Sequence, residues 1–168
     1  MRAKSVPDVK FCLVFQCETV SVPVMRRVLG DTLRRFGVDE DSVYDILLAA
    51  TEACTNVLRH SGRDVRGYTV MTSLGPVGCQ VEVADEGGGT AMAGAVADTG
   101  AGPPVPDGPR PERAIAELPE SGRGMAVMRA CVDNVTLDSS PGRGTVVTLR
   151  KHIRWSSDAP LRQLRAAS

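Results

Sequence analysis

The chain has 168 residues, 42% hydrophobic and 24% charged, and its 20 basic side chains balance its 20 acidic ones. This length and composition indicate one globular domain that can bury a core without disulfides or a structural metal, and they exclude a disordered or fibrous chain. Because the net charge is zero and the basic residues are scattered, nucleic acid and anionic membranes are not expected as direct partners.

No apolar run approaches the roughly 20 residues needed to cross a bilayer, and no apolar leader with a small-residue cleavage site follows Met1. These features predict a cytoplasmic protein. The five cysteines are widely spaced and only two histidines accompany them, which favours buried, reduced thiols over a disulfide framework or a metal site.

The first part of the chain predicts one strand and two helices. Residues 9–17 alternate loosely between apolar and polar side chains, as a strand covered on one face does. Apolar residues then recur at helical spacing between Ser21, an N-cap candidate, and Gly37, where the pattern stops. A second amphipathic helix is expected after Asp39 or Asp41, either of which can cap it, and its apolar stripe continues for about six turns.

Two segments of strand composition follow, at 67–74 and 77–84, and a short Gly75-Pro76 turn joins them into a predicted hairpin. From residue 90 to residue 121 the composition changes, because six of the eleven prolines fall there among many alanines and glycines. Such a segment cannot nucleate a core. Inside a compact domain it is either a functional lid or a disordered loop, and the two interpretations can hold together.

A short helix opening at Gly122 and two strands, at 134–137 and 145–151, complete the pattern. Strands and helices do not alternate along the chain as they do in a doubly wound parallel fold. We therefore expect an α+β two-layer sandwich with a mostly antiparallel mixed sheet and helices on one face. The expected organisation is an N-terminal arm, one domain with a lid, and a flexible C-terminal tail, at residues 1–8, 9–151 (lid 90–121) and 152–168.

Glu52 and Asn56 are the first polar residues whose spacing indicates chemistry. They lie four residues apart in the second predicted helix, so they share one face, and His60 continues the same line. An isolated E-x-x-x-N arises often by chance, and a solvated stripe is its simpler interpretation. The pair alone therefore does not define a site.

Two glycine-rich segments add to this pair. Asp85 ends a predicted strand and is followed by Gly87-Gly88-Gly89, whereas a tight turn needs only one glycine. Gly122 and Gly124 open a predicted helix, where free backbone amides favour a phosphate. The sequence has neither the G-x-x-x-x-G-K-S/T of a P-loop nor the G-x-G-x-x-G of a dinucleotide-binding unit, so a nucleotide needs another cradle.

Together these segments resemble the ATP-binding domain of the gyrase, histidine-kinase and MutL superfamily. Glu52-x-x-x-Asn56 is similar to its N box, and the remaining boxes follow in order: Asp85-x-Gly87-x-Gly89, Gly122-x-Gly124 and Gly144-Thr145. The resemblance covers residues 9–151 and implies a Bergerat-type ATP-binding fold. The small size and the segment from Glu52 to His60 resemble the anti-sigma-factor serine/threonine kinases of bacteria.

This resemblance implies ATP and Mg²⁺ as cofactors and a role for each box. Asn56 would hold Mg²⁺, a cation that takes few protein ligands beside phosphates and waters. Asp85 would accept a hydrogen bond from the adenine amine, Gly87 and Gly89 would leave room for the base, and the Thr145 hydroxyl would reach the adenine side. The phosphates would contact the second glycine box and, more weakly, the end of the second helix: Gly122, Arg123, Gly124 and Met125, then Arg59 and His60.

Glu52, one turn from the implied metal ligand, would take the proton from an attacking hydroxyl. A role in orienting Asn56 or a water remains an alternative. The implied function is an ATP-dependent serine/threonine protein kinase that acts as an anti-sigma factor, phosphorylates a STAS-type antagonist and regulates transcription through a partner switch. The alternative function is a non-catalytic ATP-binding module whose lid gates protein binding.

The expected partners are a sigma factor, its antagonist and, as a further candidate, a second copy of the chain. Arg26 and Arg27 in the first predicted helix are candidates for such a contact, although solvated arginines are the simpler interpretation. ATP hydrolysis as an end in itself is disfavoured, because 168 residues leave no room for a transducer domain beside the ATP-binding one.

Overall fold

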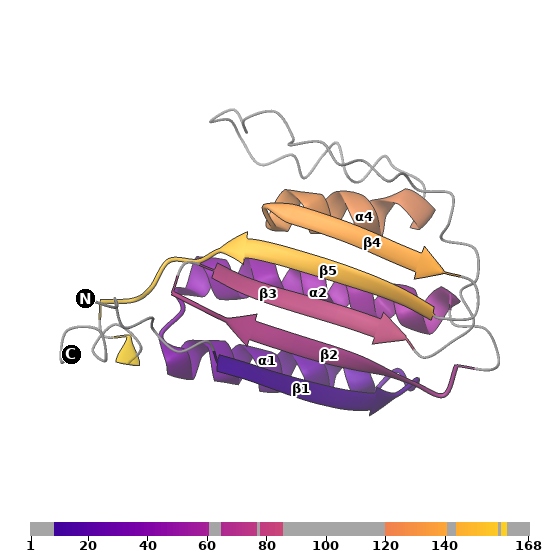
Figure 1. The fold of residues 1–168 in the computed structure, drawn as a ribbon, viewed down its shortest axis with the longest axis horizontal. Coiled ribbons are helices and arrows are strands. Elements are labelled where there is room, and N and C mark those ends of the chain that lie inside the picture. Colours follow the sequence, from indigo (N-terminus) through magenta and orange to yellow (C-terminus); the bar gives the residue numbers. More distant parts are fainter. Residues whose placement is uncertain are drawn as a thin grey trace, which may run out of the picture.

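The computed structural model describes residues 9–60, 65–76, 78–85, 120–140, 144–157 and 159–160. The expected N-terminal arm, and the expected lid up to residue 119, lie outside these residues. Figure 1 shows the helices and strands that the described part of the chain forms. In chain order they are β1 (Val9–Gln16), α1 (Ser21–Phe36), α2 (Glu40–His60), β2 (Gly67–Leu74), β3 (Gly78–Asp85), α4 (Glu120–Cys131), β4 (Asn134–Ser140) and β5 (Gly144–His152).

The strands form one sheet in the order β1-β2-β3-β5-β4, and every pairing between them is antiparallel. All of the described helices lie on the same side of this sheet, behind the strands in Figure 1. The α+β two-layer sandwich expected from the sequence is thereby confirmed. The antiparallel pairing of β3 with β5 matters most for the site, because it places the end of β3, at Asp85, beside the start of β5.

Local signals explain where α1 ends and where α2 begins, whereas Ser21, the expected N-cap, is the first residue of α1 itself and follows Val20, which makes no side-chain cap. Gly37 stops α1 with a φ of 86°, a left-handed conformation that glycine adopts without strain, and its amide donates to the carbonyl of Arg34. Asp39 caps α2, since its Oδ1 accepts a hydrogen bond from the amide of Ser42. Of the two caps that the sequence allowed, the structure therefore uses Asp39.

The core fills the space between the helices and the inner face of the sheet. Helix α1 contributes a buried stripe at helical spacing, and α2 contributes a longer one, while the strands point alternate residues inward. The side chains that are fully enclosed include Met25, Leu29, Leu33, Val43, Cys54, Tyr68, Val70, Leu74, Val83 and Met128. All five cysteines are free thiols, of which Cys12 alone is exposed.

We call the two ends of the sheet the Asp85 end and the Trp155 end, after one residue at each. At the Trp155 end, the chain after β5 crosses back over the start of α2. The indole Nε1 of Trp155 donates to the carbonyl of Pro76 at 3.0 Å, and the amide of Ser156 donates to the carbonyl of Gly37 at 2.8 Å. Ala159 is fully buried against Gly37.

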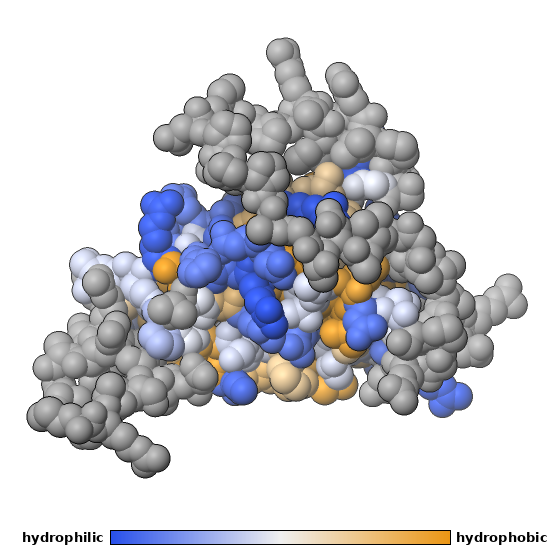
Figure 2. Space-filling view, turned by 45° about the horizontal axis from the view of Figure 1, so that its top comes forward, coloured by the Kyte–Doolittle hydropathy of each residue, from blue (hydrophilic) through white to orange (hydrophobic). Residues whose placement is uncertain are grey.

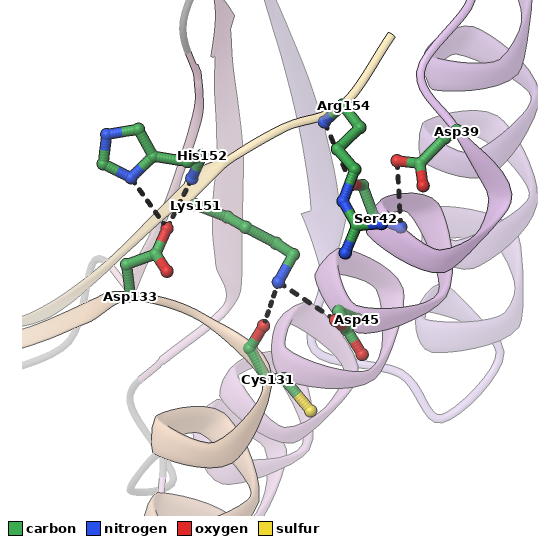
Figure 3. Close-up of polar contacts among 8 residues, drawn as sticks. All are labelled: Asp39, Ser42, Asp45, Cys131, Asp133, Lys151, His152 and Arg154. Atoms are coloured by element: carbon green, nitrogen blue, oxygen red, sulfur yellow. Dashed lines mark hydrogen bonds and ion pairs between the residues drawn. The ribbon is translucent and has the colours of Figure 1, made fainter. Parts of the chain in front are cut away.

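Side-chain contacts close the same end (Figure 3). The Lys151 ammonium lies 3.0 Å from the Asp45 carboxylate and donates to the carbonyl of Cys131. Asp133 accepts hydrogen bonds from the backbone and ring of His152. Residues 152–157 and 159, which fall in the tail that the sequence predicts to be flexible, thus make defined contacts in the structure. The reason is that Trp155 and Ala159 bury apolar surface there while the intervening backbone pairs with the α1–α2 turn.

Helix α4 begins at Glu120, two residues before the expected start at Gly122. The last two residues of the expected lid, 120 and 121, thus belong to the first turn of a helix. No helix in the described part of the chain is long and apolar enough to cross a membrane. Figure 2 shows hydrophilic and hydrophobic residues interspersed over the described surface on the side where α4 and β4 lie.

Candidate nucleotide-binding site

The polar pair of α2 lies directly against the first turns of α4. Glu52 and Asn56 project from one face of α2, and Gly124 of α4 approaches both of them. A methyl group added at Gly124 would lie 3.1 Å from Oε2 of Glu52 and 3.3 Å from both terminal atoms of the Asn56 carboxamide. Two segments that are far apart in the sequence are therefore brought together, and a residue without a side chain at position 124 lets them approach this closely.

Neither Glu52 nor Asn56 has a hydrogen-bond partner among the residues that the structure describes, although both side chains are half-buried. Their polar atoms keep access to solvent, because the hydroxyl of Thr72 is the one side-chain polar group in the described residues that is buried without a partner. A carboxylate and a carboxamide left without protein partners beside a glycine are suited to a polar ligand.

A second polar cluster forms where β3 ends. Oδ1 of Asp85 accepts a hydrogen bond of 3.0 Å from the amide of Thr145 on the neighbouring strand β5. The hydroxyl of Thr145 in turn pairs with the hydroxyl of Ser139 on β4, at 3.1 Å. The Asp85 carboxylate is thus oriented by the strand beside it. Ser139 was not singled out from the sequence, and only the pairing of Ser139 with Thr145 in the β4–β5 register could have indicated it.

The remaining predicted residues are spread around these two clusters. Arg59 and His60 are exposed in the last turn of α2, one turn beyond Asn56. Arg123 is exposed, and Met125 is half-buried and packs against the core. Gly87 and Gly89 lie outside the described residues.

The early start of α4 changes which amides can face a phosphate. In an α-helix only the first few N–H groups have no carbonyl one turn earlier to bond to. With α4 beginning at Glu120, these are the amides of residues 120–122, and those of Gly124 and Met125 take positions inside the helical ladder. A methyl group added at Gly122 would meet no atom of the described residues within 4 Å outside the backbone of α4 itself.

Burial excludes thiol chemistry from this site. Cys54 lies between Glu52 and Asn56 in the sequence but points to the opposite side of α2, where it is fully enclosed. Burial raises the pKa of the Cys54 thiol to about 12, and burial likewise raises the pKa of the neighbouring Tyr68 hydroxyl to about 12. Both groups stay protonated at neutral pH, so Cys54 is a core residue and not a nucleophile.

The two candidate arginines of α1 have different surroundings. Arg26 is half-buried, and its Nη1 donates to the hydroxyl of Thr51 at 2.6 Å. Arg27 is 86% exposed at its side chain and lies 4.0 Å from Asp31. Arg27 therefore fits the solvated alternative, whereas Arg26 is bonded to α2.

The residues present suit Mg²⁺ carried by a triphosphate better than a bare metal ion. No group of three or more histidine, cysteine or acidic side chains that could hold a metal occurs in the described part of the chain. The Asn56 carboxamide offers a single oxygen, which matches the few protein ligands that Mg²⁺ takes when phosphates and waters supply the rest.

A separate hollow of about 390 Å³ lies at the Trp155 end, lined among others by Pro76, Gln80, Arg150 and His152. None of the residues predicted from the sequence to bind a ligand lines it. The predicted residues instead gather around α2, the start of α4 and the Asp85 end of the sheet.

An antiparallel sheet covered by helices on one face makes this an α+β domain, and the acid-and-amide pair on α2 lies beside α4. Residues 15–151 match the histidine kinase-like ATPase domain family, and the chain belongs to that family. An ATPase domain of this kind implies ATP binding.

The chain is similar to bacterial kinases of this family. It is 28% identical over 129 residues to the serine-protein kinase RsbW of Bacillus velezensis, and 27% identical to that of Bacillus subtilis, covering 76% of each chain in both cases. Its fold is similar to the crystal structure of the RsbU and RsbW domains of a Mycobacterium tuberculosis protein, with a TM-score of 0.62 and 18% identity. The match covers 88% of this chain and 34% of that one.

Proposed function

We propose that this chain is an ATP-dependent serine/threonine protein kinase that acts as an anti-sigma factor in the cytoplasm. In this role it phosphorylates a STAS-type antagonist protein and thereby controls which partner, antagonist or sigma factor, it holds. The observation that carries the proposal is the Glu52 carboxylate, half-buried beside Asn56 and Gly124 with no partner among the described residues. The similarity to serine-protein kinases supports the choice of acceptor.

Each residue has a separate task in this proposal. Asp85, held by the amide of Thr145, accepts a hydrogen bond from the exocyclic amine of adenine and so favours adenine over guanine. Asn56 would hold the metal ion, and Gly124 lets α4 pack closely against Glu52 and Asn56. Mg²⁺ neutralises charge on the phosphates when it is bound.

Glu52 is the general base. As the serine oxygen forms its bond to the γ-phosphorus, the bond from that phosphorus to the bridging oxygen breaks and ADP leaves. The hydroxyl proton passes to the Glu52 carboxylate, which has no hydrogen bond within the described structure to compete for its lone pairs. Positioning of this base accounts for about 10²–10⁴-fold in rate in typical enzymes.

The test is intact-mass spectrometry of STAS-type antagonists encoded near this gene, after incubation with the protein and Mg·ATP. We expect a gain of one phosphoryl group that Glu52→Gln abolishes while ATP affinity, measured by calorimetry, is retained. Glu82→Gln is the matched control, because it makes the same change on the sheet face away from the helices. Transfer that persists in Glu52→Gln would remove Glu52 from this role.

Failure of the wild-type protein to transfer phosphate to any antagonist, despite measurable ATP binding, would instead favour the non-catalytic module. Nucleotide would then act only by changing which protein surface is available. Size-exclusion chromatography with light scattering, run on the same samples, tests whether the kinase also pairs with a second copy of itself.

A further inference from the structure

Arg26 is bonded to the turn of α2 that carries Glu52. Its Nη1 donates to Oγ1 of Thr51 at 2.6 Å and approaches the carbonyl of Leu47 at 3.4 Å. Oγ1 of Thr51 itself donates to the carbonyl of Leu47 at 2.6 Å. The three groups form a closed hydrogen-bonded set, and Thr51 is the residue immediately before Glu52.

The position of this hydrogen-bonded set matters because no described residue orients the Glu52 side chain by a hydrogen bond. Its carboxylate makes no hydrogen bond with any residue that the structure describes, so the backbone of α2 sets its direction toward Gly124. A threonine that bonds to the carbonyl four residues earlier tends to bend a helix. At Thr51 the guanidinium of Arg26 binds the same two oxygens and so ties this turn of α2 to α1.

Contacts at both sides of Arg26 hold α1 against the core and against α2, so the backbone position of Arg26 is fixed. At its start, Oγ of Ser21 donates to the carbonyl of Glu18 at 2.6 Å and pairs with the Tyr68 hydroxyl at 2.7 Å in the core. One turn after Arg26, Gly30 lets α1 approach α2 closely, since a methyl group there would lie 3.1 Å from the Leu47 side chain.

We infer that Arg26 is a positioning residue for Glu52, acting through Thr51 and the turn of α2 that both share. The inference rests on the proposed role of Glu52 as the base. It assigns Arg26 a function inside the domain, in contrast to the protein-contact role considered from the sequence. Arg35, on the same helix, is exposed and has no partner within the described residues, so it serves as a matched control.

The first measurement is the single-turnover rate of phosphoryl transfer at saturating ATP, together with the dissociation constant of ATP. Arg26→Gln should lower the rate about tenfold, the effect of a small misplacement of a reacting group, while leaving ATP affinity within about twofold. Thr51→Val should act similarly, and combining it with Arg26→Gln should add little, because both remove the same contact. Arg26→Lys should restore part of the rate, and Arg35→Gln should leave it unchanged.

The second measurement does not need catalysis. In protein with ¹³C-labelled glutamate carboxyls, the Glu52 resonance is identified by its loss in Glu52→Gln. Its chemical shift should move in Arg26→Gln and in Thr51→Val but not in Arg35→Gln. If the wild-type protein transfers no phosphate, the kinase proposal fails, and this resonance alone decides whether Arg26 positions Glu52.

An unchanged Glu52 resonance in Arg26→Gln would overturn the inference, as would equal effects of Arg26→Gln and Arg35→Gln. A parallel loss of ATP affinity and thermal stability in Arg26→Gln and Thr51→Val would also overturn it, since Arg26 would then only support the fold. If Arg26→Gln does not fold, Thr51→Val and Thr51→Ser carry the test, with loss expected in the first and retention in the second.

Discussion

The two ends of the sheet consist of the same strands, but their polar groups are used differently. At the Trp155 end, backbone and side-chain groups pair with one another, as in the contacts of Trp155 with Pro76 and of Lys151 with Asp45. At the Asp85 end, Glu52 and Asn56 have no such partners in the described part of the chain. Polar groups that are hydrogen-bonded within the protein stabilise the fold, whereas polar groups without such partners can bind a ligand.

The largest expected effect is on stability and concerns Gly37 at the Trp155 end. Gly37→Ala should destabilise the fold by about 3 kcal/mol, because an alanine is strained at a φ of 86° and its methyl would lie 2.5 Å from Ala159. Chemical denaturation measures the loss, and Gly122→Ala adds the same methyl where no atom lies within 4 Å. A loss equal in both variants would show that neither the φ of Gly37 nor its contact with Ala159 requires a glycine at this position.

At the Asp85 end, Gly124→Ala should lower the affinity for ATP without lowering the free energy of unfolding. Its methyl would push against Glu52 and Asn56, so we expect ATP to bind about tenfold or more weakly, as overpacking by one methyl group implies. Alanine is the better helix former, so the free energy of unfolding should stay the same or rise by up to about 1 kcal/mol. Calorimetric titration and chemical denaturation of the same preparation check both signs. Unchanged ATP affinity would place the phosphates away from α4.

Asp85→Asn tests the adenine end of the same site. The variant should bind ATP about 1–3 kcal/mol more weakly, the cost of losing a charge-assisted hydrogen bond at a partly buried site. An asparagine still offers an oxygen to the amide of Thr145, so the contact between β3 and β5 is preserved. Asp138→Asn, at an exposed position of β4, is the control for the change in net charge. Equal affinities in calorimetry would show that adenine binds elsewhere.

The smallest effect is a dependence of stability on alkaline pH, which arises at the Trp155 end, where Cys79 is the second residue of β3. Burial raises the pKa of the Cys79 thiol from 9.0 to about 12. The folded state therefore keeps a proton that the unfolded chain loses, and this contribution is complete below pH 9 and declines as the pH rises toward 12.

Denaturation curves between pH 9 and pH 11 measure this dependence. The free energy of unfolding should fall less steeply in Cys79→Ala than in the wild-type protein, by about 1.4 kcal/mol per pH unit. Cys12→Ala reports the effect of removing an exposed thiol. Identical slopes for the wild-type protein and Cys79→Ala would contradict the assignment.

The sequence predicts the features that depend on local spacing. The separation of Glu52 and Asn56 fixes their common face, and Gly37 ends α1 as expected because only glycine favours its conformation. The element order indicates the fold class. The sequence predicts the start of α4 two residues late, at Gly122, because glycines are poor helix formers, whereas the helix extends through Gly122.

Features that depend on packing across the molecule are not visible in the sequence. The contact of Asp85 with Thr145 requires β3 to lie beside β5, and the role of Ser139 requires the register of β4. The tail lacks any periodic pattern, so its docking against the α1–α2 turn could not be predicted. Arg26 has the same local sequence context as Arg27, and only the approach of α1 to α2 distinguishes them.

Trp155 is the single tryptophan of the chain and is anchored to Pro76 at the end of the sheet remote from Asp85. The fluorescence of Trp155 is therefore an intrinsic probe of the Trp155 end of the domain. Undocking of the tail should alter that emission, whereas a nucleotide bound beyond Asp85 has no direct contact with the indole. With a fluorescent ATP analogue in the same sample, docking of the tail and binding of the nucleotide could be measured together without labelling the protein.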